Sequence, residues 1–317
     1  MKALVTGAAG FIGSSLATAL TGDGIEVVGL DCFTDFYARD IKEHNIAALR
    51  QRSNFRLIDA PLQTADLEAA LDEVTHVFHL AAQAGVRSSW GSDFTTYTSH
   101  NVDATQRLLE AVKDRPLSRF VYASSSSVYG DAAAIPMTED SPVRPVSPYG
   151  VTKLAAEHLC YLYHVNHGVP SVSLRYFTVF GPGQRPDMAF HRFLKAAHTG
   201  QPLSLYGDGE QTRDFTYVAD AVAATRAAGD RGRPGAVYNI GGGSRISIRE
   251  VLALIETLAG RPLVIHRGPA QKGDMRDTFA DTTRARQDLG FVPSSSLAAG
   301  LAAESDWIAG LLQRSAS

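Results

Sequence analysis

The chain has 317 residues, of which 44% are hydrophobic and 20% charged, and its formal net charge at pH 7 is −3. The Lys and Arg residues are scattered without a long basic run, so neither nucleic acid nor a membrane is an expected partner. No apolar stretch approaches the roughly 18 residues that a membrane helix needs. A first strand that begins at residue 2 leaves no room for a signal peptide, which predicts a cytoplasmic protein.

Short β-branched segments alternate with helical stretches through the first part of the chain, as in a parallel sheet built from βαβ units. After FGPGQRPDM the loops lengthen and Gly and Pro become denser, which predicts a second, smaller α/β domain. We expect the first domain to span 1–177 and the second to span 178–213 and 242–317. Within 214–241, DFTYV and AVYNIG are expected to return to the first sheet as strands. The other predicted strands are KALVTG, EVVGLD, FRLID, HVFHLAA, RFVYAS and SVSLRYF, and the predicted helices span 12–20, 40–51, 97–113 and 148–166.

The segment VTGAAGFIGSSL follows the first predicted strand and opens a helix. Gly7, Gly10 and Gly13 form a variant of the dinucleotide-binding turn, in which backbone approaches a pyrophosphate at a helix N-terminus. Asp31 ends the second strand, where a carboxylate accepts hydrogen bonds from an adenosine ribose and repels a 2′-phosphate. The pattern predicts a Rossmann-type doubly wound sheet that binds NAD in preference to NADP; a structural glycine turn is the alternative. Asp59, after the third strand, is a candidate for the adenine edge or a turn-forming residue.

The segment SPYGVTKLAAEH reads as a helix start, with Ser147 as N-cap and Pro148 in the first helical position. Tyr149 and Lys153 are four residues apart and share one helix face. An ammonium beside a phenol lowers the pKa of the phenol, which gives a base usable near neutrality. By itself such a pair is more often a chance pair on an amphipathic helix. Beside a glycine loop and the serine run of YASSSSVYG, it indicates a catalytic pair.

Cys32 and Cys160 are the two cysteines, with no C-x-x-C pair between them. They are expected to be small core residues and not a redox couple or a zinc site. The ten histidines show no cluster with ligand spacing. No bound metal is therefore expected.

These motifs occur in an order that resembles the extended short-chain dehydrogenase/reductase superfamily, in its nucleotide-sugar epimerase, dehydratase and decarboxylase branch. The resemblance covers essentially the whole chain through GAAGFIG, HLAA, SSSSVYG, SPYGVTK, RYFTVFGP and RDFTYV. HLAAQAGVRSSW, RYFTVFGP and RPDMAFHRF are most similar to UDP-glucuronate 4-epimerases. The resemblance implies that the first domain binds NAD and the second binds a UDP-sugar. The cofactor-binding residues that it implies are Gly7, Gly10, Phe11, Ile12, Gly13, Asp31, Asp59, Leu80, Ala81, Ala82, Tyr149, Lys153 and Tyr176.

The resemblance also implies a catalytic triad. The hydroxyl residue of such a triad stands three residues before the Val of V-Y-G, which is Ser125 here. Ser125 would orient the sugar hydroxyl, Tyr149 would take its proton, and Lys153 would tune Tyr149 and hold the nicotinamide ribose. Related 4,6-dehydratases carry an Asp-Glu pair directly before V-Y-G, and decarboxylases carry a Glu. This chain has Ser126 and Ser127 at these positions, which disfavours both reactions.

Several residues are expected to bind the substrate. Arg87 and Arg185 are candidates to hold the carboxylate of a uronic acid by a bidentate fork, with a phosphate contact or a surface ion pair as the alternative. Thr178 stands where many branches carry Asn, and is expected at the carboxylate or a diphosphate oxygen. Tyr206 would lie against uracil. Arg213 and Arg276 would meet the diphosphate, Asp274 would meet a ribose, and Ser125, Ser126 and Ser127 would face the sugar.

The leading hypothesis is NAD-dependent epimerisation of UDP-glucuronate at C4 to UDP-galacturonate through a 4-keto sugar. UDP-glucose and UDP-N-acetylglucosamine are alternative substrates. A decarboxylase, a 4,6-dehydratase or a non-catalytic NAD-binding sensor is less favoured, because the triad is intact and the extra carboxylates are missing. The family commonly dimerises through two helices of each subunit, so a homodimer is expected through 97–113 and 148–166.

Overall fold

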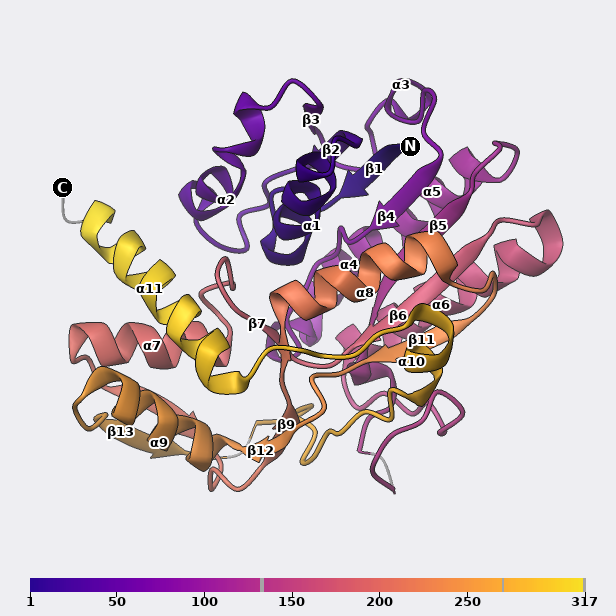
Figure 1. The fold of residues 1–317 in the computed structure, drawn as a ribbon. Coiled ribbons are helices and arrows are strands. Elements are labelled where there is room, and N and C mark those ends of the chain that lie inside the picture. Colours follow the sequence, from indigo (N-terminus) through magenta and orange to yellow (C-terminus); the bar gives the residue numbers. More distant parts are fainter. Residues whose placement is uncertain (132–133, 270, 316–317) are drawn as a thin grey trace.

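The computed structural model describes residues 1–131, 134–269 and 271–315, and within them seven parallel strands form one sheet in the order β11-β6-β5-β4-β1-β2-β3. The strand order reverses between β1 and β4, and the cleft of a doubly wound sheet opens at such a point (Figure 1). The α/β class and the parallel sheet predicted from the sequence are confirmed. The strands are β1 (Lys2–Thr6), β2 (Glu26–Asp31), β3 (Phe55–Asp59), β4 (His76–His79), β5 (Arg119–Ser125), β6 (Ser171–Tyr176) and β11 (Val237–Ile240).

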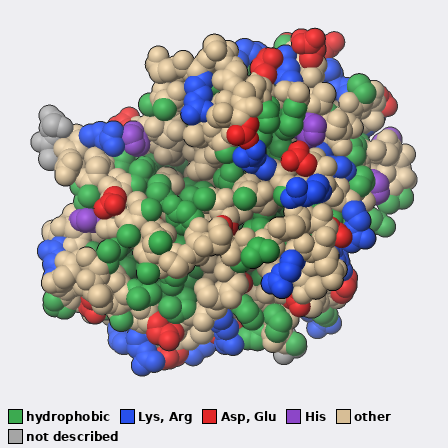
Figure 2. All heavy atoms as spheres, viewed as in Figure 1, with side chains coloured by type: hydrophobic (Ala, Val, Ile, Leu, Met, Phe, Trp, Pro, Cys, Tyr) green, Lys and Arg blue, Asp and Glu red, His purple; other side chains and the backbone are tan. Residues whose placement is uncertain are grey.

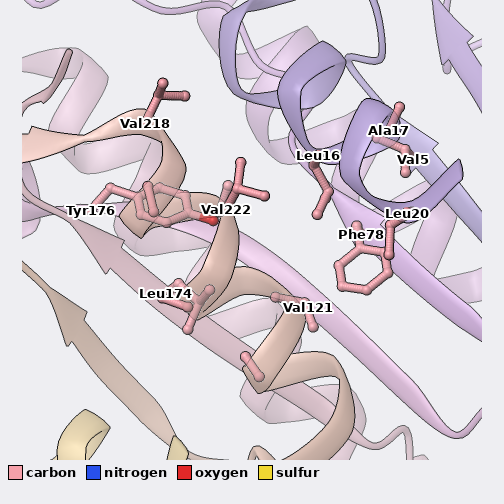
Figure 3. Packing of buried hydrophobic residues seen from close by; sticks show 14 of the residues in the cluster. Val5, Leu16, Ala17, Leu20, Phe78, Val121, Leu174, Tyr176, Val218 and Val222 are labelled. Carbon is pink, nitrogen blue, oxygen red and sulfur yellow. The ribbon is translucent and has the colours of Figure 1, made fainter. Parts of the chain in front are cut away.

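Helices cover both faces of this sheet, which is why its strands read as nearly continuous apolar runs. On one face, α1 (Phe11–Gly22) and α8 (Val218–Arg231) pack Leu16, Leu20 and Val222 against strand residues such as Val121 (Figure 3). The core on the other face joins sheet residues to α3 (Leu67–Ala70), α5 (Ala104–Val112) and α6 (Pro148–His167).

Two predicted helices are interrupted. The stretch 97–113 is divided into α4 (Phe94–Tyr97), a π-helical segment over Thr98–Asp103 and α5. The π segment carries the buried Asn101, whose amide donates to the backbone carbonyl of Gln83 and to the hydroxyl of Thr152 in α6. The second interruption follows α2 (Arg39–Ile46), where a 3₁₀ turn over Leu49–Gln51 replaces the end of the predicted helix.

The two strands expected to return to the main sheet behave differently. AVYNIG contributes β11, which pairs with β6. DFTYV stays outside the sheet, so that prediction is wrong. Its residues instead end β9 (Thr212–Asp214) and form β10 (Thr216–Tyr217). The physical reason is that the backbone at 214–215 packs tightly against Gly242, just after β11 ends. The Asp214 carboxylate accepts the Gly242 N–H at 2.8 Å, and a Cβ on Gly242 would lie 1.9 Å from the Phe215 carbonyl oxygen.

The remaining elements form a smaller α/β part below the main sheet in Figure 1. A separate core joins its three helices, and three two-stranded sheets accompany them. The exact boundaries between the NAD-binding and UDP-sugar-binding domains stay a prediction. The helices are α7 (Ala189–Thr199), α9 (Ile248–Ala259) and α11 (Leu297–Ser315), and the paired strands are β7 (Val179–Phe180) with β10, β9 with β12 (Arg245–Ser247), and β8 (Leu203–Tyr206) with β13 (Ile265–Gly268). The helix α10 (Thr283–Leu289) packs against α8 and β11.

A buried polar network lies beneath the N-terminal half of α6. The Arg175 guanidinium of β6 donates to both carboxylate oxygens of Glu157 in α6. Glu157 also accepts the Ser124 hydroxyl of β5 at 2.6 Å. Arg175 reaches further to the hydroxyl of Tyr129, which donates to Asn239 of β11 at 2.6 Å. The network therefore ties α6 to three adjacent strands.

The surface shows no concentration of one charge on the face drawn in Figure 2, where Lys and Arg lie interspersed with Asp and Glu. None of the helices within the described residues is long and apolar enough to cross a membrane.

Candidate active site

A cleft of about 750 Å³ runs along the carboxyl edge of the main sheet, between the sheet and the smaller α/β part. It begins at the loop after β1 and reaches the segments around β8 and β9. Most residues predicted for the site line it, although they come from distant parts of the chain. They are Gly7, Gly10, Phe11, Ile12, Gly13, Asp31, Leu80, Ala81, Ala82, Arg87, Ser125, Ser126, Ser127, Tyr149, Lys153, Tyr176, Thr178, Arg185, Tyr206, Arg213 and Asp274.

The glycine loop is folded tightly against the end of β1. Gly7 has a φ of +72° and donates its N–H to the carbonyl of Leu30 at 2.7 Å. A Cβ on Gly13 would lie 2.0 Å from the Gly7 carbonyl oxygen, so only glycine fits there. Both glycines are therefore needed for the loop to bring the N-terminus of α1 to the cleft, where its free N–H groups attract an anion.

Asp31 is fixed at the end of β2 before any ligand arrives. Its carboxylate accepts the backbone N–H groups of Ala9 at 3.0 Å and of Phe33 at 2.8 Å. The buried ammonium of Lys42 lies 3.9 Å from the same carboxylate. A carboxylate held rigidly at the cleft beside the glycine loop fits the ribose of a dinucleotide, so these residues fit NAD.

The predicted triad residues come together at the centre of the cleft. Ser125 ends β5, and its hydroxyl accepts the Ser127 N–H at 3.1 Å. Tyr149 lies in the first turn of α6, which is capped as expected by the Ser147 hydroxyl accepting the Gly150 N–H at 3.1 Å. Burial raises the pKa of Tyr149, while the charge of Arg185 and a hydrogen bond with the Ser125 side chain lower it. The phenol is thus placed where two neighbours favour its ionisation.

Lys153 is one helical turn after Tyr149 and is almost fully buried. Its ammonium lies 4.7 Å from the centroid of the Tyr122 ring. Burial lowers the pKa of Lys153 to about 8. The charge of Arg185 lowers the pKa of Tyr149. The role of Lys153 in tuning Tyr149 stays a prediction.

Arg185 lies in the loop between β7 and α7. Its Nε donates to one carboxylate oxygen of Asp187 at 3.0 Å, and Nη2 donates to the other at 3.2 Å. The remaining terminal nitrogen, Nη1, bonds to no group in the part of the chain that the structure describes. Arg185 is therefore oriented by Asp187 while part of its fork stays available to an anion.

Arg87 and Asp274, both predicted to bind substrate, bind each other. Arg87 donates to both oxygens of Asp274, with a shortest distance of 2.6 Å. The guanidinium of Arg87 also lies 4.5 Å from the centroid of the Tyr206 ring. Arg213 is held nearby by the carbonyls of Thr212 at 2.8 Å and of Arg276 at 3.0 Å. Burial lowers the pKa of Arg213, and the charge of Arg87 adds to that effect.

Asp59 and Arg276 do not line the cleft, contrary to expectation. The Asp59 carboxylate is half exposed and pairs with Arg39 at 2.7 Å. The Arg276 guanidinium is more than half exposed and pairs with Asp208 at 3.0 Å. In each case an ion pair holds the side chain at the surface, with Arg39 at the start of α2 and with Asp208 in the loop between β8 and β9. The second cation beside Arg213 is accordingly Arg87.

The cleft also contains residues that sequence reasoning missed. Lys42, Asp187 and Arg192 line it, and the Arg192 guanidinium lies 5.7 Å from the Tyr206 ring centroid. Asp187 could have been suspected, because it follows a candidate arginine by two residues in RPD. Lys42 and Arg192 lie on amphipathic helices, where the sequence pattern predicts that a single cation is exposed to solvent.

The fold and the cleft define a Rossmann-type enzyme that binds a dinucleotide at one end of the cleft and a second anionic ligand at the other. The chain belongs to the NAD dependent epimerase/dehydratase family, whose profile matches residues 3–241. It is an NAD-dependent nucleotide-sugar epimerase, as the resemblance implied.

Relatives of known name cover nearly the whole chain. A Bacillus subtilis (strain 168) protein called "uncharacterized UDP-glucose epimerase YtcB" is 45% identical over 317 residues, which are 99% of each chain. The crystal structure of UDP-glucuronic acid 4-epimerase from Bacillus cereus with UDP-glucuronic acid and NAD has a TM-score of 0.96 at 45% identity, covering 98% of this chain and all of that one (100%). MoeE5 in complex with UDP-glucose and NAD has a TM-score of 0.88 at 42% identity, covering 100% of both chains.

The close packing of the glycine loop generates a prediction about NAD. Gly13→Ala should weaken NAD binding by at least about tenfold, because the new methyl group collides with the Gly7 carbonyl and displaces the loop. The measurement is NAD content after purification, followed by titration calorimetry. Gly22→Ala in the same helix is the matched control, since its Cβ would meet Arg52 at 3.7 Å and should leave binding unchanged. Full NAD occupancy in the Gly13 variant would contradict the prediction.

Proposed function

We propose that the protein epimerises UDP-glucuronate at C4, giving UDP-galacturonate through a 4-keto sugar. The observation that carries this proposal is the position of Arg185, which lines the cleft together with Tyr149 and whose charge lowers the pKa of that phenol. A guanidinium beside the base offers a carboxylate partner within reach of the carbon that reacts. A neutral sugar has no group that needs this cation.

The residues of the cleft supply proton transfer and orientation. Tyr149 accepts the proton of the C4 hydroxyl, and the Ser125 hydroxyl, within hydrogen-bond reach of Tyr149, orients that hydroxyl. NAD, when bound, takes the C4 hydride and returns it, so the cofactor is not consumed. Return to the other face of the 4-keto sugar inverts C4, and Tyr149 then gives the proton back to the oxygen.

The enzyme must also prevent the uronate carboxylate of the 4-keto intermediate from leaving as carbon dioxide. A 4-keto glucuronate is a β-keto acid, which readily loses carbon dioxide when its C5–C6 bond aligns with the ketone. Two bonds to Asp187 orient the Arg185 fork, so a carboxylate bound to it is held in one rotamer. Ser126 and Ser127 line the cleft where decarboxylases and dehydratases of the family carry carboxylates. Neither serine can act as a carboxylic acid or base, which supports epimerisation over both reactions.

The far end of the cleft suits a UDP group. The guanidinium groups of Arg87 and Arg192 both lie near the Tyr206 ring, 4.5 and 5.7 Å from its centroid. We propose that it faces uracil while Arg213 and Arg87 neutralise the diphosphate. Thr178 lines the same cleft and remains a candidate contact for the carboxylate or the diphosphate.

UDP-glucose is the second candidate substrate, favoured by the name of the Bacillus subtilis relative and by the UDP-glucose complex of MoeE5. NMR of the purified protein with UDP-glucuronate, UDP-glucose and UDP-N-acetylglucosamine, offered separately without added NAD, tests the proposal. Conversion of UDP-glucuronate to its C4 epimer supports it, and exclusive conversion of a neutral sugar refutes it. A pentose or dehydrated product would identify a decarboxylase or dehydratase.

Tyr149→Phe should retain NAD and UDP-sugar binding and lower turnover by about 10²–10⁴-fold, because the variant keeps the ring and loses the proton acceptor. Initial rates and calorimetric affinities measure the two effects separately. Full activity in this variant would show that another group is the base.

Arg185→Ala should weaken UDP-glucuronate binding by about 100-fold and UDP-glucose binding by less than about threefold, because only the uronate leaves a charge unpaired. The measurement is calorimetry on the NAD-loaded enzyme, together with assay of released carbon dioxide. Arg249→Ala, an exposed arginine of α9, is the control. Equal losses for both sugars would exclude the carboxylate role.

We also propose a homodimer formed through α6. This helix carries four large apolar side chains with exposures of 48% to 60%, namely Val151, Tyr161, Leu162 and Val165. Such a group of exposed apolar side chains on one helix is typical of a protein–protein interface. Val165→Glu should shift the sedimenting species from dimer to monomer, whereas Val292→Glu, equally exposed but on another surface, should not. A monomeric parent protein would refute the proposal. A cytoplasmic location likewise stays a prediction.

A further inference from the structure

Glu304 is a buried carboxyl that the proposed reaction does not use. It lies in α11, with 0% of its surface exposed. Its Oε2 accepts the Gly181 N–H at 2.7 Å, and its Oε1 has no hydrogen-bond partner among the described residues. Burying a carboxyl with one partner is unfavourable, so its position calls for a compensating role.

Gly181 begins the loop that carries Arg185. Its φ of +132° and the 2.7 Å between an added Cβ and Val218 restrict this position to glycine. The Gly181 carbonyl accepts the Gln184 N–H at 3.0 Å, and the Gln184 side chain donates to the Val179 carbonyl at 3.1 Å. These bonds close the loop into a compact turn, so the position of Arg185 follows that of Gly181.

The same face of α11 supports the other end of this loop. Trp307, three residues after Glu304, makes an edge-to-face contact with His191 at 5.8 Å between ring centroids. The His191 ring hydrogen-bonds through Nδ1 to the Gln184 carbonyl at 2.9 Å, and the His191 N–H donates to the Gln184 side chain at 2.9 Å. One turn of α11 therefore braces both ends of the segment 181–191.

We propose that Glu304 is a positioning residue that holds the 181–191 loop and thereby places Arg185 for a uronate carboxylate. This inference rests on the proposed role of Arg185. It makes the C-terminal helix, which contributes no residue to the lining of the cleft, part of substrate selection.

The surroundings of Glu304 determine its charge. No Lys, Arg or His of the described residues lies within ion-pair distance of it. Tyr217 is the titratable neighbour on which its charge acts; Asp220 bonds to Ser294, and His198 of α7 bonds to Ser305. On α9, the Glu250 carboxylate accepts the N–H and the hydroxyl of Ser247, and the Glu256 carboxylate accepts the Leu263 N–H.

Burial raises the pKa of Glu304 to about 8, so the side chain is a neutral acid at pH 7. A loop conformation that admits water lets the carboxyl ionise at its ordinary pKa, so opening becomes more favourable as the pH rises toward 8 and levels off above it. The hold on the Arg185 loop should therefore weaken as the pH rises toward 8 and change little beyond that.

The test compares UDP-glucuronate and UDP-glucose affinities by calorimetry at pH 6.5 to 9.5, in NAD-loaded protein that carries Tyr149→Phe to prevent turnover. The ratio of the two affinities isolates the carboxylate contact, because Lys153 and the UDP contacts act on both sugars. Hydrogen exchange of the peptide spanning 181–191 reports the loop independently of the sugar. The variants are Glu304→Leu, Glu304→Gln and, as a matched control, Asp306→Asn, an exposed carboxylate of the same helix.

We expect Glu304→Leu to lower the ratio by about tenfold at pH 7 and to speed exchange of the loop. Glu304→Gln, which cannot ionise, should keep the ratio within about twofold and lose the decline between pH 6.5 and 8, and Asp306→Asn should match the parent. Unchanged loop exchange in Glu304→Leu would overturn the inference. So would faster exchange with an unchanged ratio. Arg185→Ala decides separately whether the carboxylate role itself has failed.

Discussion

The buried ion pair between Arg175 and Glu157 is the constraint on which the catalytic face depends. Leaving one member of such a pair alone in the interior costs about 3–5 kcal/mol, so the pair resists any separation of α6 from β6. Glu157 is one helical turn beyond Lys153 and two beyond Tyr149, on the same side of α6. By also accepting the Ser124 hydroxyl, it fixes the strand end that carries Ser125. The buried contacts of Glu157 therefore fix the position of Tyr149 relative to Ser125.

Three arginines of the cleft are held in two different ways, and under the proposed function this difference gives them different roles. Arg185 and Arg87 are each paired with a carboxylate, Asp187 and Asp274 respectively. A substrate must share or replace these partners, which makes both contacts sensitive to geometry. Arg213 bonds to backbone carbonyls, so its charge is not neutralised by a direct contact. We infer that Arg213 supplies general attraction for a diphosphate, whereas Arg185 supplies discrimination.

Sequence reasoning predicted the geometry correctly where a local pattern encodes it. The glycine loop, the capped start of α6 and the serines at the end of β5 are short segments whose geometry follows from their own residues and from the parallel sheet. It failed where a side chain has a choice of distant partners. Asp59 and Arg276 carry the expected charge, yet ion pairs that no local pattern specifies hold them at the surface. The partners are Arg39 at the start of α2 and Asp208 in the loop after β8. DFTYV likewise has the composition of a strand, but close packing of its backbone against Gly242 keeps it outside the main sheet.

Glu304 shows the same limit in its strongest form. In the sequence it is one acidic residue in an ordinary C-terminal helix, 119 residues beyond Arg185 (304 − 185). Only the packing of α11 against α7 and β7 brings its carboxyl to the Gly181 N–H. The proposed triad can be read from motifs because its residues lie in short segments at the end of β5 and the start of α6. In the proposed function, selection of one sugar depends on how firmly Arg185 is held, and residues packed behind its loop, which no motif specifies, set that property.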